Sequence, residues 1–412
     1  MITLCRGTNA APALLYQEKS DCLFYDSIQE DVPMKKNVLR IVKVLSLVIA
    51  VALTLGLLQE FVLVHADHNR ERLKGFYEES SDTLDVVILG ASEVYSDYAP
   101  GYAYAYSGVT GYLFATQANS ILNYKSQLKN ILSRQDPDLI VIELNGAVYG
   151  DEEEVTKEAN LRNYVDNVPL DAVKLEYIRD NVTENQIEYL FPIMKYHGTW
   201  QDLPEQGKYI KTIVQDRQRG YNYLKGILNE TGIYRSAEIS YNSSLPELAD
   251  SKKPLTAIEE KGLRDLLQYC RDEGLENVVF ARFPHIVVTR TYERFERSNT
   301  VGDIVAEYGY DYLNFERDIA LTGLDEKNDF YNLDHLNIYG QKKFTAYLTD
   351  YLINHYGLSA HERSEQDKAE WDACARYYDA YYRYSDELIK AGDSRELSED
   401  CDLIDTLQTY LQ

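Results

Sequence analysis

Short apolar runs recur along the chain from about residue 83 onward, and stretches with helical periodicity separate them. The runs are Val86–Leu89, Leu139–Leu144, Val278–Ala281 and Tyr310–Phe315. Uninterrupted apolar runs of this length are typical of strands that are buried on both faces of a parallel sheet. Helices are expected at 115–133, 256–271, 298–308 and 338–354. This alternation predicts an α/β fold in which helices cover both faces of a parallel sheet.

A longer apolar segment lies nearer the N-terminus. Within residues 44–58 only Ser46 and Thr54 are polar, and the apolar character resumes at Phe61–Val64, which gives about the 20 residues that a bilayer core requires. The basic residues just before it are Lys35, Lys36, Arg40 and Lys43. By the positive-inside rule they place the N-terminus in the cytoplasm and the rest of the chain outside the plasma membrane. We predict one uncleaved membrane-spanning helix; a cleaved signal peptide is the alternative, but no small-x-small pattern follows this segment.

These patterns divide the chain into five segments. They are a cytoplasmic tail or upstream extension of the reading frame at 1–33, a transmembrane signal-anchor at 34–64, a stalk at 65–82, an α/β domain at 83–356 and a C-terminal helical extension at 357–412. Tyrosine-rich and asparagine-rich helical sequence interrupts the alternation at about 150–251. We interpret it as an insertion over one end of the sheet that forms a lid or binds an acceptor.

The composition excludes several classes of function. A formal net charge of −25 argues against nucleic-acid binding, because phosphate neutralisation requires clustered Lys and Arg. The five cysteines have neither metal-site spacing nor the pattern of a disulfide framework. At most Cys270, Cys374 and Cys401 share the outer compartment, which permits one disulfide bond. No metal or other cofactor is expected, because His and Asp do not cluster at ligand spacing.

A serine and a histidine stand where an α/β fold binds ligands. Ser92 follows Gly90-Ala91 at the carboxyl end of the first predicted strand, and His335 lies in a loop just before an amphipathic helix. A serine hydroxyl becomes a nucleophile when a neighbouring base accepts its proton. The pair predicts a serine esterase or acyltransferase. The structural alternatives are that Ser92 packs a strand against a helix and that His335 caps its helix.

The serine block DVVILGASE and the histidine block DFYNLDHLNIYGQKKF, in this order, resemble those of the SGNH (GDSL-like) hydrolase superfamily over residues 83–356. The resemblance implies a flavodoxin-like sheet, Ser92 as nucleophile and His335 as general base. In the superfamily an acid usually stands three residues before the histidine, where this chain has Asn332. The alternatives for orienting the ring are the adjacent Asp334, the Asn332 carbonyl, a Ser-His dyad without a third member, and Asp329.

The same resemblance points to donors for an oxyanion. They are the Ser92 amide, a glycine of the second block, for which Gly108 and Gly111 are candidates, and an asparagine of the third block, Asn145, with Asn119 as a substitute. A plain strand-ending turn is the alternative for Asn145.

Four further residues are candidates for substrate binding. His197 and Trp200 lie in KYHGTW, similar to a KYH-x-x-W stretch of membrane-anchored relatives, and are typical of a sugar-facing or gating site; a structural histidine is the alternative. Arg162 and Arg282 are candidates to hold a carboxylate or phosphate group, with ion pairing within the protein as the alternative. His285 follows a strand end and is expected to line the same cleft.

The expected function is that of a membrane-anchored extracytoplasmic esterase or O-acyltransferase, with acetyl as the usual acyl group, acting on cell-envelope polysaccharide. A membrane-bound acyltransferase is an expected partner. The alternative is a catalytically weak protein of the same fold that binds glycan or scaffolds an envelope-assembly complex.

Overall fold

The computed structural model describes residues 36–58, 68–196, 198, 201, 204, 207, 221–235, 237–317, 319–395, 397 and 403–411. It divides into two units, Met1–Leu63 and Val64–Gln412. In the first unit, Lys36–Leu58 form one helix that is long and apolar enough to cross a membrane. Its large apolar side chains are exposed, as at Leu47 and Leu57. The predicted apolar helix is therefore confirmed.

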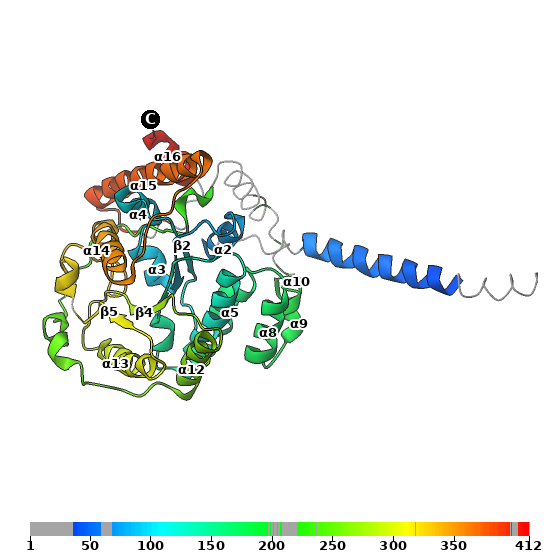
Figure 1. The fold of residues 1–412 in the computed structure, drawn as a ribbon, viewed down its shortest axis with the longest axis horizontal. Helices are drawn as coiled ribbons and strands as arrows, with labels where there is room; N and C mark the ends of the chain where they lie inside the picture. Colours follow the sequence, from blue (N-terminus) through cyan, green and yellow to red (C-terminus); the bar gives the residue numbers. More distant parts are fainter. Residues whose placement is uncertain are drawn as a thin grey trace, which may run out of the picture. The chain divides into compact units, whose positions relative to one another are not determined.

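The second unit is built on five parallel strands in the order β2-β1-β3-β4-β5 (Figure 1). The strands are β1 (Val86–Gly90), β2 (Gly111–Ala115), β3 (Leu139–Glu143), β4 (Val278–Arg282) and β5 (Tyr312–Asn314). The predicted parallel α/β fold is confirmed. Strand β2 was not predicted, because its sequence GYLFA is short and runs directly into residues that were assigned to a helix.

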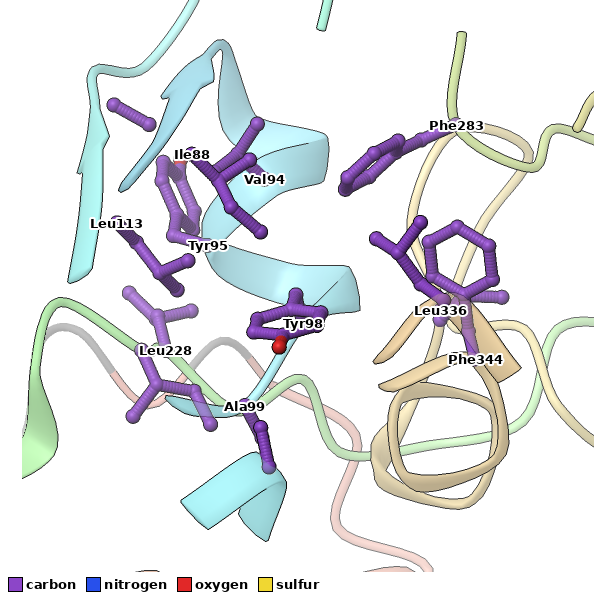
Figure 2. Packing of buried hydrophobic residues seen from close by; sticks show 14 of the residues in the cluster. Ile88, Val94, Tyr95, Tyr98, Ala99, Leu113, Leu228, Phe283, Leu336 and Phe344 are labelled. Atoms are coloured by element: carbon purple, nitrogen blue, oxygen red, sulfur yellow. The ribbon is translucent and has the colours of Figure 1, made fainter. Parts of the chain in front are cut away.

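Alternate residues of β1 pack into two separate hydrophobic clusters, so both faces of the sheet are covered. Val86 and Ile88 belong to one cluster, and Val87 and Leu89 belong to the other. The first is completed by α3 (Ser92–Asp97), α4 (Pro100–Ser107) and α14 (Ile338–Tyr356). The second is completed by α5 (Ile121–Leu132), α12 (Ala257–Asp272) and α13 (Tyr292–Glu307). Figure 2 shows Ile88, Val94 and Tyr95 packed together in the first cluster.

Capping residues account for where the long helices begin. Thr256 and Glu259 form a capping box at the start of α12, and Asn337 caps α14, which ends at Gly357 in the left-handed conformation. Both helices lie close to their predicted positions. Helix α5 begins later than predicted because Ala115 still belongs to β2 and Ser120 supplies the cap.

The remaining elements are α2 (His68–Glu78), η1 (Asn145–Ala147), α6 (Glu152–Thr156), α7 (Glu158–Val165), α8 (Ala172–Asn181), α9 (Gln186–Leu190), α10 (Ile193–Tyr196), η3 (Tyr221–Leu224), η4 (Asn242–Leu248), η5 (Ile319–Thr322), α15 (Glu365–Ala391) and α16 (Leu403–Tyr410). Part of the predicted insertion belongs to the core rather than to a lid. The Leu113 amide donates to the Lys225 carbonyl (3.2 Å), and the Leu228 amide donates to the Tyr95 carbonyl (2.9 Å). Residues 225–230 therefore run beside β2 and α3.

The C-terminal helices are also part of the core. Trp371 joins one hydrophobic cluster and Tyr381 joins the other. Helices α4 and α15 lie side by side (Figure 1), so close that a Cβ atom on Gly101 would lie 2.9 Å from the Cys374 carbonyl oxygen. Cys270 and Cys374 are buried free thiols, and burial raises the pKa of each to about 12. Of the cysteines expected outside, these two are not joined, and Cys401 lies outside the described residues.

Because α15 fills the core, Trp371→Ala should lower the free energy of unfolding of residues 64–412 by about 3–5 kcal/mol. Trp371 is 3% exposed. Leu175→Ala on α8 is the matched control, since Leu175 is 52% exposed and its loss should change stability by less than about 0.5 kcal/mol. Urea denaturation measures both. Equal effects of the two substitutions would show that the C-terminal helices are an appendage.

Candidate active site

The turn after β1 presents Ser92 at the carboxyl end of the sheet. Ala91 precedes α3 in an extended conformation, and Ser92 is the first helical residue. The turn requires glycine at position 90, where a Cβ atom would lie 2.5 Å from Val94 Cγ2 and 2.8 Å from Glu143 Cβ. Ser92 is half-buried, whereas the rest of α3 is buried. The hydroxyl therefore stands at the surface of an otherwise enclosed helix.

His335 is paired with a buried glutamate that the sequence did not reveal. The ring atom Nδ1 lies 3.2 Å from Oε1 of Glu230, whose side chain is 1% exposed. The loop is closed by an antiparallel bridge between Phe330 and Leu336. Among the described residues, Nε2 of His335 has no hydrogen-bond partner. This nitrogen is therefore the one available to exchange a proton.

The surrounding carboxylates favour the imidazolium form of His335. Burial of the ring opposes this charge, but the hydrogen bond and charge of Glu230, with the charges of Glu93 and Asp97, outweigh burial and raise the pKa to about 10. In physical terms, Glu230 occupies the position of the orienting acid in a Ser-His-acid triad.

The predicted orienting groups have other partners. Asn332 Oδ1 accepts from the backbone amides of Asp334 and His335, both at 2.8 Å, which turns its NH₂ group toward Nδ1 at 3.1 Å. Its carbonyl therefore cannot accept a proton from the ring. The Asp334 carboxylate lies 3.6 Å from Arg294, and Asp329 pairs with Lys343 at 2.7 Å. The carboxylate that lies on Nδ1 of His335 is thus that of Glu230 and not that of Asp334 or Asp329.

Helix α3 holds the histidine loop and Glu230 together. Ser96 Oγ donates to Glu230 Oε1 (3.4 Å), and the Leu336 amide donates to Asp97 Oδ1 (2.9 Å). Ser92 and Ser96 are four residues apart, so they share one face of the helix. Ser92 Oγ itself donates to Glu93 Oε2 (3.4 Å), its only hydrogen bond among the described residues. It makes none to His335; such bonds are often formed only when a substrate is bound.

Glu93 is a second buried carboxylate with a histidine partner. Its Oε1 lies 3.3 Å from Nε2 of His285, and Nδ1 of His285 lies 2.7 Å from the Phe283 carbonyl oxygen. Burial disfavours the charge of Glu93, but the hydrogen bond and charge of His285, with the charges of His335 and Arg282, hold its pKa well below the usual range. Glu93 thus lies between His285 and Ser92 and contacts both.

Arg282 positions Asn145 and is not available to a substrate. The guanidinium is fully buried, and Nη1 lies 2.5 Å from Asn145 Oδ1. Arginine only donates hydrogen bonds, so the atom facing it must be the amide oxygen. Nδ2 of Asn145 makes no hydrogen bond to any residue in the described ranges. Asn145 therefore has an NH₂ group that could donate to a ligand, and its role as an oxyanion donor stays a prediction. Arg282, which was expected to bind substrate, is instead paired within the protein.

The other predicted oxyanion donors do not reach Ser92. Gly111 pairs with Val86 at the amino end of β1, which is the opposite end of the sheet from Ser92. Gly108 caps the C-terminus of α4. It lies two residues before Thr110, whose backbone amide donates to the Asp85 carboxylate at the amino end of β1. The NH₂ group of Asn119 donates to the Gly90 carbonyl and to Gln127, both at 2.8 Å.

The predicted substrate-binding residues of the insertion are not assembled at this site. Arg162 pairs with Asp166 (3.1 Å) and Glu158 (2.7 Å) and lies over the Tyr189 ring. It forms an ion-pair cluster within the insertion, in keeping with the structural alternative. His197 and Trp200 lie outside the described residues.

Comparison with known proteins does not assign the chain to a family. No protein-family model matches it, and no curated protein matches it. The case for a function therefore rests on the geometry of Ser92, His335, Glu230 and Asn145.

Glu230→Gln should lower the pKa of His335 from about 10, because the substitution removes the carboxylate that favours the imidazolium. NMR titration of the His335 ring in residues 64–412 measures this shift, with the exposed Glu153→Gln as control. Since the folded-state pKa is raised, the pair stabilises the fold fully below about pH 6.5 and loses this effect as pH rises through about 10. Identical titration curves in the wild type and Glu230→Gln would contradict the pairing.

Proposed function

We propose that this chain is a membrane-anchored serine esterase or O-acyltransferase of the SGNH type. Ser92 is the nucleophile, His335 the general base and Glu230 the acid that orients the base. The observation that carries the proposal is the buried Glu230 carboxylate on Nδ1 of His335, in a loop that docks on the helix beginning with Ser92. The bonded Nδ1 leaves Nε2 to accept the serine proton.

The reaction follows from these roles. Ser92 Oγ attacks the carbonyl carbon of an ester and passes its proton to His335, which then protonates the departing alcohol. The resulting acyl-serine is attacked by water or by a sugar hydroxyl, whose proton goes to His335. As the bond between the acyl carbon and Ser92 Oγ breaks, His335 returns this proton to Oγ, and the acyl group leaves on the new oxygen. The Asn145 NH₂ group and the Ser92 amide are the donors for the oxyanion of each tetrahedral intermediate.

The topology of the sheet supports the placement of this site. In the order β2-β1-β3-β4-β5, which is that of flavodoxin-like folds, the direction of winding reverses between β1 and β3. Ligands of such sheets bind in the crevice outside the carboxyl ends of the strands at this switch point. Ser92 directly follows β1, and Asn145 follows β3. The proposed nucleophile and oxyanion donor therefore flank the switch point.

The apolar helix supports a location at the membrane. With Lys36, Arg40 and Lys43 in its first part, the helix would place residues 64–412 outside the plasma membrane. A tethered enzyme meets membrane-linked polymers at a high effective concentration. Cell-envelope carbohydrate as acceptor, acetyl as acyl group and a membrane-bound acyltransferase as partner rest on this location and on the resemblance of the two sequence blocks.

A second function is favoured by one observation. The Ser92 hydroxyl donates to Glu93 and not to His335. A protein in which this arrangement is permanent would bind glycan or scaffold an envelope-assembly complex without turnover.

Labelling of the full chain in detergent with a fluorophosphonate probe separates the two functions. We expect the wild type to react, and Ser92→Ala and His335→Ala to lose labelling by at least about 10²-fold, because the probe requires an activated serine. Ser80→Ala, an exposed serine outside the site, is the matched control and should label like the wild type. Absence of labelling in the folded wild type would favour the scaffold.

The role of Glu230 as the orienting acid can be tested by transferring its carboxylate to position 332. Glu230→Gln should lower the labelling rate by about 10²-fold at high pH. In the double variant Glu230→Gln, Asn332→Asp, the new carboxylate would replace the NH₂ group that lies 3.1 Å from Nδ1 and still accept the loop amides, so the rate should recover. A double variant no faster than Glu230→Gln would show that Glu230 has a different role.

A further inference from the structure

A line of hydrogen bonds leads from Ser92 away from His335. Ser92 Oγ donates to Glu93 Oε2 (3.4 Å), and the second oxygen of this carboxylate lies 3.3 Å from Nε2 of His285. The other ring nitrogen of His285 lies 2.7 Å from the Phe283 carbonyl oxygen. Glu93 is 1% and His285 2% exposed, so water does not compete for the bonds of His285. The arrangement is therefore buried from Glu93 to Phe283 and reaches the surface at Ser92.

The donors and acceptors fix where the protons are. The Phe283 carbonyl oxygen can only accept a hydrogen bond, so Nδ1 of His285 carries a proton. Nε2 of His285 faces Glu93 Oε1 at 3.3 Å, and the hydrogen bond and charge of this neighbour favour the carboxylate form of Glu93 by lowering its pKa. Glu93 therefore remains a carboxylate while it accepts the one proton of the Ser92 hydroxyl. A hydroxyl that donates to Glu93 cannot donate to His335 at the same time.

We propose that Glu93, held in place by His285, is a positioning residue that restrains the Ser92 hydroxyl in a resting state, turned away from the general base His335. This inference rests on the proposed function. Reaction requires that Ser92 exchange its 3.4 Å bond to the Glu93 carboxylate for one to His335.

Glu93 also acts on the base itself. The titratable and charged groups that face Glu93 are His285, His335, Arg282, Glu143, Asp97, Tyr124 and Tyr149. Those that face His335 are Glu230, Glu93 and Asp97. The negative charge of Glu93 is among those that favour the imidazolium form of His335. Removal of this charge should increase the fraction of His335 that is neutral and able to accept a proton. Both effects of Glu93 lower the reactivity of Ser92 at neutral pH.

Three substitutions separate these effects. Glu93→Gln removes the charge; its amide group can donate to a neutral His285, so the buried partners stay satisfied. Glu93→Asp keeps the charge but shortens the side chain, which withdraws the acceptor from Ser92. His285→Gln leaves Glu93 charged but removes the histidine beside it. The restraint on Ser92 should therefore persist, and the negative charge of Glu93 should favour the imidazolium form of His335 more strongly.

The test is the pH dependence of the fluorophosphonate labelling rate of the full chain in detergent. Relative to the wild type, Glu93→Gln should label about tenfold faster at pH 7, with its midpoint about one pH unit lower. Glu93→Asp should label faster with an unchanged midpoint, and His285→Gln should label more slowly. Glu153→Gln, which is exposed, is the control for net charge. Thermal denaturation identifies any variant that does not fold.

The possible outcomes distinguish the restraint by Glu93 from the proposed function. Labelling that requires Ser92 and His335 in the wild type, with Glu93→Gln and Glu93→Asp no faster, would overturn the restraint and leave the proposed function intact. If Glu93→Gln does not fold, Glu93→Asp decides the same question. Labelling of the wild type that does not require Ser92 would overturn both.

Discussion

The fully buried guanidinium of Arg282 is the interaction on which the carboxyl edge of the sheet depends. A buried cation without partners is strongly unfavourable, so the chain must bring acceptors to it. Glu143 at the end of β3 (3.5 Å), Glu316 after β5 (3.3 Å) and Asn145 supply them. Glu143 in turn accepts from the backbone amides of Asn145 and Ala91. The guanidinium thereby links the ends of β1, β3, β4 and β5 and fixes both the turn before Ser92 and the orientation of Asn145.

Much of the fold could be predicted from the sequence because the responsible signals are local. The apolar runs of β1, β3 and β4 are buried on both faces, and Thr256 and Asn337 cap their helices by contacts within a few residues. The elements that were missed depend on distant partners. Strand β2 is defined by its pairing with β1, and the amphipathic helix α15 was identified as a helix but not as part of the core that Trp371 helps to fill.

The candidate site divides in the same way. Ser92 and His335 each stand at the end of a recognisable local pattern, after a strand and before a helix. Glu230 has no such pattern, because its position beside His335 depends on the return of residues 225–230 along β2 and α3. The nearest available signal was an acidic residue two positions after the short apolar run at 227–228. Asn332, which marked the absence of the usual acid, retains the role of shaping the loop through its two backbone contacts.

The charges around Ser92 form one coupled system. The buried carboxyl groups Glu93, Asp97, Glu143, Glu230 and Glu316 outnumber the basic groups Arg282, His285 and His335. A buried excess of negative charge is unfavourable, so the cluster retains protons. Burial and the charge of Glu93 raise the pKa of Glu143, although the charge of Arg282 opposes the rise. The charges of Glu230, Glu93 and Asp97 raise the pKa of His335 and so favour its protonated form. The basicity of His335 is therefore set by the whole edge of the sheet rather than by Glu230 alone.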